Sequence, residues 1–280
     1  MVGVMYDSRT VGPATQDYTV ATIPVIHAPA SQQLSVFTAV ESWYRQISHN
    51  HCRICIDVLP CVVIEHDPNK YAQAGGMGAP PGNSQTLVRH VLDCSDHTIV
   101  QRLRAGEDRL MIITGNAFKP HTWRLPNRGI RYSILPSNAC FGAIAHELGH
   151  LLFDWPDLDW EQSLGQDCLM SLGALGSHGH SPSLPCAPLR LSQDWIKPIV
   201  IDRSTTVQQL NTDKVGIVNW QQYRVFVEYR RQHENAYLLI YRCKGKEKHI
   251  HPRVIGRMKL TEADNSSSVL GCIATVLRTC

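Results

Sequence analysis

Residues 143–157 constrain the chain most, because His146, Glu147 and His150 stand in the pattern His-Glu-x-x-His within an apolar segment. In an α-helix, residues four positions apart lie on one face, about 5–6 Å apart at their Cβ atoms. Both imidazoles would therefore reach a single zinc ion at about 2.0–2.1 Å. Glu147 would lie beside the ion, where a carboxylate can take a proton from a zinc-bound water. The segment predicts a zinc-binding helix with Glu147 as the general base.

Length and composition predict a folded protein with a substantial core. The chain has 280 residues, of which 43% are hydrophobic and 18% are charged. The net charge of +3 is too small to favour nucleic acid as a partner. No apolar run approaches the roughly 20 residues that span a bilayer. The first residues lack the pattern of a signal peptide, so the protein is intracellular, leaves by another route, or has a leader outside this sequence.

The ten cysteines are scattered along the chain. An even number permits disulfides without demonstrating them, and a Cys168–Cys186 bond would staple the loop after the zinc-binding helix. Residues 49–55 contain two histidines and two cysteines, which we interpret as a turn with buried thiols, with a second zinc site as the alternative. His178 and His180 are assigned to a surface loop, with substrate binding as the alternative.

The first half of the chain predicts strands and helices in alternation. Apolar patterning and turn residues predict strands at 18–26, 54–59, 61–64 and 109–114, helices at 31–47 and 85–92, and a surface loop at 65–83. Residues 115–137 are expected to be irregular and to run along the sheet edge before the zinc-binding helix. In a protease, such an edge contacts an extended substrate by strand addition.

The second half predicts loops followed by short strands. A loop-like segment extends from Asp157 to Pro188 and is followed by a short helix at 189–196. Strands are expected at 200–201, 215–218, 223–229 and 236–241. Four tyrosines of this region could stabilise an oxyanion, namely Tyr223, Tyr229, Tyr237 and Tyr241. We interpret Arg224, Arg230 and Arg231 as a solvated strand face.

Several motifs, in the same order along the chain, resemble the zinc metalloendopeptidases of the immune inhibitor A (cowrin) family. That family has His-Glu-Phe/Leu-Gly-His, two residues, Gly, and then Leu-Pro-Asp. The resemblance covers roughly residues 18–245 and rests on motif order. The matching segments are His146–Asp157, the helix end Ser42–Ser48, the Leu-Met turn Gly165–Gly173, the short helix Leu189–Ile196 and the β-rich segments 227–230 and 238–242.

The resemblance implies that His146, His150 and Asp157 bind zinc (Zn2+) and that Met170 is the Met-turn residue beneath the site. Two departures affect Asp157: Phe153 replaces the family's glycine, and the Pro-Asp pair comes one residue late. Glycine lets the chain leave the helix with positive φ, which phenylalanine disfavours. Asp154 is therefore a rival third ligand, possible only if the helix ends by Leu152; geometry favours Asp157.

These observations predict an α+β fold with a zincin/metzincin-like catalytic domain at residues 1–198 and a β-rich C-terminal portion at 199–280. The expected activity is peptide-bond hydrolysis through a zinc-activated water, with Glu147 as general base and a protein or peptide as substrate. One alternative is a catalytically degenerate module of the same fold that retains metal and only binds. Another is a zinc hydrolase that does not act on peptides.

Overall fold

The structure is a computed structural model. It describes residues 2–4, 16–24, 30–63, 71, 84–115, 119–126, 129–158, 164–220, 222–232, 235–244, 251–261, 264 and 266–279. The chain divides into two compact units. Unit 1 comprises Met1–Trp155 and Leu175–Pro182, and unit 2 comprises Pro156–Ala174 and Ser183–Cys280. This division differs from the predicted domains at residues 1–198 and 199–280, which stay a prediction.

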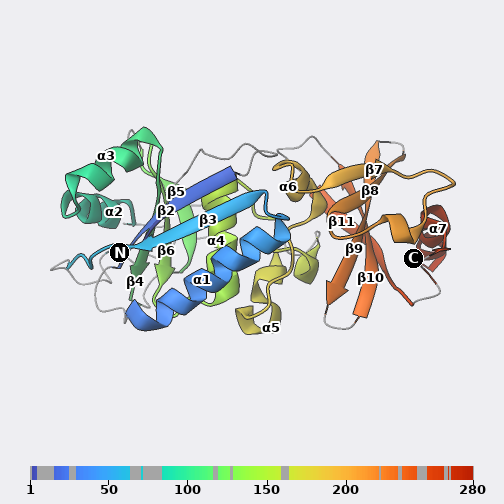
Figure 1. Ribbon diagram of the computed structural model, residues 1–280, viewed down its shortest axis with the longest axis horizontal. Coiled ribbons are helices and arrows are strands. Elements are labelled where there is room, and N and C mark those ends of the chain that lie inside the picture. The colour runs from blue at the N-terminus through green and yellow to red at the C-terminus, as the bar shows by residue number, and fades with distance from the viewer. Residues whose placement is uncertain are drawn as a thin grey trace. The chain divides into compact units, whose positions relative to one another are not determined.

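Unit 1 is built on a six-stranded mixed sheet with the order β1-β3-β2-β4-β6-β5 (Figure 1). Strands β2, β3, β4 and β6 are parallel to one another, whereas β5 pairs antiparallel with β6 at the end of the sheet. The strands are β1 (Val2–Val4), β2 (Gln16–Pro24), β3 (Cys52–Val58), β4 (Arg109–Thr114), β5 (His121–Arg124) and β6 (Arg131–Pro136).

Helices pack on both faces of this sheet, as expected of parallel strands joined by helical crossovers. On one face, α2 (Ser84–Asp93) and α3 (His97–Ala105) form a core with alternate residues of β4 and β6, including Leu110 and Ile134. On the other face, α1 (Ala30–Ile47) packs against α4 (Phe141–Phe153), and the Tyr44 hydroxyl donates to the carbonyl oxygen of Ala145 at 2.6 Å. This second face positions the His-Glu-x-x-His helix.

The predicted helices at 31–47 and 85–92 and the strand at 109–114 are confirmed by α1, α2 and β4. The expectation that residues 115–137 are irregular is wrong, because they contain β5 and β6. Strand β6 lies inside the sheet, where Ser133 is buried beside apolar neighbours, so its sequence does not alternate cleanly. Helix α3 was not predicted; it starts at the Asp96 cap and ends at Gly106, which has φ 76°.

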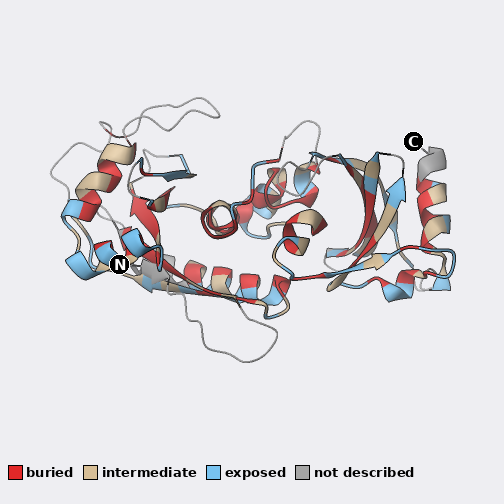
Figure 2. Ribbon diagram, turned by 90° about the horizontal axis from the view of Figure 1, so that it is seen from above, coloured by how far each residue is buried: buried red, intermediate tan, exposed pale blue. Residues whose placement is uncertain are grey.

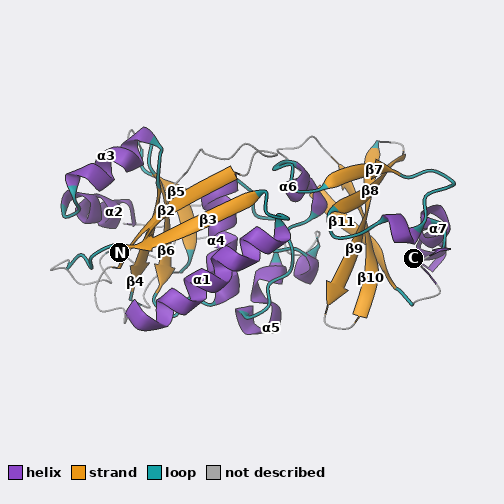
Figure 3. Cartoon of the chain, in the orientation of Figure 1, coloured by secondary structure: helices purple, strands orange, loops and turns teal. Residues whose placement is uncertain are grey.

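Unit 2 contains a five-stranded sheet with the order β11-β10-β9-β8-β7 (Figure 3). It consists of β7 (Lys197–Val200), β8 (Lys214–Trp220), β9 (Tyr223–Gln232), β10 (Asn235–Lys244) and β11 (His251–Lys259). Strands β8, β9 and β10 confirm the runs predicted at 215–218, 223–229 and 236–241, whereas β7 shares only Val200 with the run predicted at 200–201. Sequence reasoning missed β11 and the helix α7 (Val269–Thr279). Figure 2 shows buried residues along the helix next to the C-terminus. The buried residues of α7 include Ile273 and Val276, which join the core of this sheet.

A buried charged cluster anchors the short helix α6 (Ala187–Leu191) to the unit 2 sheet. Glu228 accepts hydrogen bonds from Arg190 (2.5 Å), from the Tyr241 hydroxyl and from the Ala187 amide (2.8 Å). Arg230 forms an ion pair with the same carboxylate at 2.9 Å. Arg230 is 4% exposed, so its interpretation as part of a solvated face is wrong. Arg230 shares the Glu228 carboxylate with Arg190 and also donates to the carbonyl oxygens of Leu184 and Pro185, which helps to hold its charge inside.

The pKa of Glu228 reflects this pairing. Burial by itself would raise that pKa, but Arg230 and Arg190 favour the ionised form and hold it below its usual value.

In the part of the chain that the structure describes, no helix is long and apolar enough to cross a membrane. The mixed α/β content and the two mixed sheets are compatible with the expected α+β class, and the assignment to zincins stays a prediction.

Candidate metal centre

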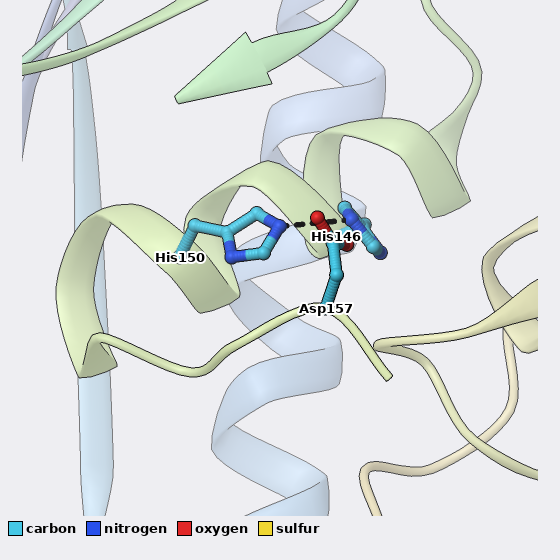
Figure 4. Close-up of side chains that lie close together, drawn as sticks. All are labelled: His146, His150 and Asp157. Atoms are coloured by element: carbon cyan, nitrogen blue, oxygen red, sulfur yellow. Dashed lines mark hydrogen bonds between the residues drawn. The ribbon is translucent and has the colours of Figure 1, made fainter. Parts of the chain in front are cut away.

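Helix α4 presents its two histidines side by side. Its apolar residues Ile144, Leu148 and Leu151 are buried, which fixes the orientation of the helix, whereas His146 and His150 are half-buried. The two Nε2 atoms lie 3.0 Å apart, and the ring planes meet at 82° (Figure 4). The spacing of four residues therefore brings both imidazole nitrogens to one point, as the helical geometry predicts.

Asp157 brings a carboxylate to the same point. One ligand atom from each of His146, His150 and Asp157 lies within 4.8 Å of the other two (Figure 4). Within the described residues, this is the one group of three or more histidine, cysteine or acidic side chains that is close enough to hold a metal ion. Asp157 is exposed, whereas both histidines are half-buried.

The turn after α4 explains how the extra residue is accommodated. The helix continues through Phe153 and ends at Asp154, which adopts the left-handed conformation with φ 59° and ψ 26°. Asp154 thus takes the backbone role that the resemblance assigns to glycine, one position later. Aspartate tolerates this conformation better than most residues. The spacing from this residue to the Pro-Asp pair is then the same as in Gly-Leu-Pro-Asp.

Phe153 has a packing role instead. Its ring contacts Tyr18, Tyr44 and Trp155, with centroid separations of 5.2, 5.6 and 4.7 Å. These aromatic contacts bury the last turn of the helix.

Asp154, the rival ligand, points to a different partner. Its Oδ1 accepts from Arg131 Nη2 at 2.8 Å, and its Oδ2 lies 3.7 Å from Arg124. Arg131 also donates to the carbonyl oxygen of His150 at 2.5 Å, so it satisfies an acceptor at the end of the helix. Asp154 is outside the group of three that could hold a metal. Of the two aspartates, Asp157 is the one whose carboxylate lies in that group, and its role as the third ligand stays a prediction.

The donor set fits a zinc ion. The Nδ1 atom of His150 is 2.6 Å from the carbonyl oxygen of Trp155, which can only accept, so Nδ1 carries the proton. In the neutral ring, Nε2 then presents its lone pair toward His146. Two nitrogens bound tetrahedrally to zinc would lie about 3.3 Å apart, close to the observed 3.0 Å. Two imidazoles and a carboxylate are common ligands of catalytic zinc.

The carboxylate of Glu147 is oriented by strand β5. Glu147 is 5% exposed, and its Oε2 accepts a hydrogen bond from Thr122 Oγ1 at 2.7 Å. Thr122 Oγ1 lies 2.6 Å from Ser133 Oγ across the β5–β6 ladder. Because the Thr122 proton goes to the carboxylate, Ser133 must donate to Thr122. This chain of hydroxyls fixes one carboxylate oxygen of Glu147, and sequence reasoning did not identify either hydroxyl.

His121 precedes Thr122 and is half-buried. Burial lowers the pKa of His121, while the carbonyl oxygen of Lys119, 2.8 Å from Nδ1, and the charge of Glu147 oppose the shift. The imidazole is therefore neutral at pH 7. The only sequence signal for His121, Thr122 and Arg131 was their position just before the metal helix.

The other sequence-predicted groups do not assemble a second metal site among the described residues. The 49–55 segment was interpreted as a turn with buried thiols, and this is correct only in part. His49 and Asn50 form a turn with positive φ, but Cys52 and Cys55 lie in β3, where Cys52 is buried and Cys55 is exposed. Cys168 and Cys186 are free thiols; the Cys186 amide donates to Cys168 Sγ at 3.3 Å.

Other residues singled out in the sequence lie outside the group formed by His146, His150 and Asp157. They belong to unit 2 or lie in and next to α5 (Gly176–Gly179). Tyr241 is fully buried against Glu228, so it is not available as an oxyanion donor. Met170 is fully buried, and its role as the Met-turn residue stays a prediction. His178 and His180 are exposed, as expected of a surface segment.

No protein-family model matches this chain, and no curated protein matches it. The candidate site therefore rests on its own geometry and on the motif resemblance.

Proposed function

We propose that the chain is a zinc-dependent metalloendopeptidase with a zincin-like catalytic fold, in which His146, His150 and Asp157 hold the zinc ion. One observation carries this proposal: one ligand atom from each of the three residues lies within 4.8 Å of the other two. Two of these residues lie on α4, the helix that also carries Glu147, and Asp157 follows it. The orientation of His150 by the Trp155 carbonyl supports it, because ligand histidines usually donate their second nitrogen to such an acceptor.

Glu147 and Thr122 have different roles in the proposed hydrolysis. Zinc, when bound, lowers the pKa of a water molecule and polarises the carbonyl group of the substrate. Glu147 takes a proton from the attacking water and delivers it to the leaving amine. Thr122 holds Glu147 Oε2 through a hydrogen bond, which leaves Oε1 to accept the proton. Proton transfer of this kind contributes about 10²- to 10⁴-fold to the rate.

Strand β5 is the proposed docking edge for an extended substrate. It ends the unit 1 sheet, with β6 as its partner, and it packs beside α4. A peptide added to the other edge of β5 would use main-chain hydrogen bonds and would pass next to Glu147. This arrangement favours a peptide over the other substrates of zinc hydrolases.

Digestion of a broad peptide library tests the activity. We expect internal peptide bonds to be cleaved, cleavage to stop when a chelator removes the metal, and cleavage to return when zinc is restored. Zinc bound at about one ion per chain without any cleavage would instead support the degenerate binding module. A chain that binds no zinc would overturn both.

The third ligand is tested by comparing two neighbouring aspartates. We expect Asp157→Asn to lower the zinc content measured by atomic absorption, because one charged donor is lost from the site. Asp154→Asn is the matched control, because asparagine also adopts the left-handed conformation and Asp154 is not in the ligand group. Full zinc in Asp157→Asn with loss in Asp154→Asn would reverse the assignment.

A further inference from the structure

Three arginines stand in a row across neighbouring strands of unit 1. Arg124 of β5 pairs with Arg131 of β6, and Arg109 begins β4, the next strand in the sheet. Directly opposite residues in an antiparallel pair point to the same face, so Arg124 and Arg131 share a face. That face is the one covered by α4, because both arginines reach Asp154 at the end of the helix.

The row has a surplus of positive charge. In the part of the chain that the structure describes, Asp154 is the carboxylate that pairs with Arg124 and Arg131. Arg109 donates to the carbonyl oxygen of Gly106 at 2.6 Å, and the nearby Asp108 carboxylate pairs with Arg102. Burial lowers the pKa of Arg131 and of Arg109; Asp154 opposes this shift at Arg131 and Tyr18 opposes it at Arg109, while repulsion from neighbouring arginines adds to it at both. An additional anion would be stabilised here.

Arg124 is the member of the row that is open to a ligand. Its side chain is 64% exposed and lies 3.7 Å from Asp154, whereas Arg131 is 17% exposed and holds Asp154 at 2.8 Å. Arg131 already fixes the cap of α4 through Asp154 and the His150 carbonyl. A loose, exposed pair contributes little to stability, so the folded state does not require Arg124 to stay on Asp154.

The position of Arg124 relates it to the proposed reaction. Thr122, two residues earlier on the same face of β5, contacts Glu147. Two residues of a strand span about 7 Å. Among the described strands, β5 has a partner on one edge only. A peptide paired with its other edge would place one side chain opposite Thr122, at the reacting bond, and the next on that face opposite Arg124.

We propose that Arg124, with Arg131 behind it, forms a subsite for an acidic side chain of the substrate, two residues along the peptide from the position opposite Thr122. The proposal rests on the proposed function and names its substrate class: peptides with aspartate or glutamate near the cleaved bond. The side chains would pair as cross-strand neighbours with Cβ atoms about 5 Å apart.

The test uses synthetic peptides that differ only by glutamate, glutamine or lysine at one position within three residues of the cleaved bond. At the position that faces Arg124, we expect kcat/KM to be roughly tenfold higher for glutamate than for lysine, because Arg124 attracts glutamate and repels lysine. The preference should shrink as salt is added, because the pair is exposed. It should vanish in Arg124→Gln and reverse in Arg124→Glu.

Arg104→Gln and Arg104→Glu are the matched controls. Arg104 is an exposed residue of α3, on the opposite face of the sheet, so these variants change the net charge equally and should keep the preference. Zinc content and urea unfolding of the Arg124 variants should match those of the unmodified chain.

A wild-type enzyme that cleaves the peptides without charge preference would overturn the subsite and leave the proposed function standing. A preference that persists in Arg124→Gln would also overturn it. Failure to cleave any peptide would remove the proposed function, and the subsite with it.

Discussion

Each unit contains a buried glutamate, and the two are held in opposite ways. Glu228 of unit 2 is 1% exposed and is surrounded by donors, with two arginines, a tyrosine hydroxyl and a backbone amide on its carboxylate. Glu147 of unit 1 is 5% exposed, and the donor on its carboxylate is the Thr122 hydroxyl. Both carboxylates are nearly removed from solvent, but only Glu228 is neutralised by opposite charges.

The difference separates a structural role from a chemical one. A carboxylate whose lone pairs are occupied and whose charge is balanced cannot accept a proton easily, so Glu228 serves to join α6 to the sheet. A carboxylate that accepts at one oxygen from a neutral hydroxyl, as Glu147 does from Thr122, has no charge partner of this kind on it and can accept a proton at the other oxygen. Burial alone therefore does not identify a catalytic acid or base; the number and charge of its partners do.

The largest expected effect is on the activity of Glu147→Gln. Glutamine keeps the shape and the contact with Thr122 but cannot accept the proton, so kcat should fall about 10²- to 10⁴-fold. Zinc content should not change, because Glu147 is not a ligand in the proposed site. Steady-state kinetics and metal analysis check both. Full activity in this variant would remove Glu147 from the mechanism.

Glu228→Gln should affect stability instead. Removing the charge leaves Arg190 and Arg230 buried without their counterion, which costs about 3–5 kcal/mol of unfolding free energy. Urea unfolding measures this change. Glu107→Gln, at an exposed glutamate, is the control and should change stability by less than about 0.5 kcal/mol. An equal, small effect in both variants would mean that the cluster contributes little.

Thr122→Val tests what orients Glu147. Valine matches the shape of threonine but has no hydroxyl, so a hydrogen bond to a charged group worth about 1.5–3 kcal/mol is lost. We expect kcat to fall at least tenfold, with KM little changed, because the carboxylate loses its orientation while the docking edge remains. Thr122→Ser keeps the hydroxyl and should retain most of the activity. Equal losses in both variants would point to packing instead of the hydrogen bond.

Local spacing along the chain was easier to predict than contacts between distant segments. Helix geometry alone predicted that His146, Glu147 and His150 share a site, because their spacing is local. Thr122 and Ser133 could not be found that way, since they meet Glu147 only through the register of β5 and β6. Arg230 was misinterpreted because the segment that covers it is distant in sequence. Its partner Glu228 lies on the same strand, but Arg190 and the rest of α6, which bury the pair, come about 40 residues earlier in the chain.

The departure at Phe153 shows a different limit. The motif resemblance indicated that a glycine is missing, but only the backbone shows that Asp154 takes the left-handed position one residue later. A pattern of residue types does not reveal which residue adopts positive φ when several can.

The contribution of Glu228 to stability should depend on pH. The pKa of Glu228 is lowered on folding, so its stabilising effect is complete well above the usual value of 4.5 and is lost as the pH falls through the folded value. Protonated glutamate resembles glutamine, so the difference between the unmodified chain and Glu228→Gln should shrink below about pH 4.5. Urea unfolding at several pH values measures it. A difference that stays constant with pH would mean that charge does not underlie it.

The smallest expected effect concerns Asp154, where the turn of unit 1 replaces glycine with aspartate. Asp154→Gly loses an exposed ion pair worth about 0–1 kcal/mol but adopts φ 59° without strain, so stability should change by about 1 kcal/mol or less. Asp154→Ala loses the same pair and also bears the left-handed penalty of about 1–2 kcal/mol, so it should be the less stable variant. Both should keep zinc, since neither alters the ligand group. If the alanine variant were as stable as the glycine variant, the positive φ would not limit which residue can stand at the end of this helix, because both variants lose the same ion pairs.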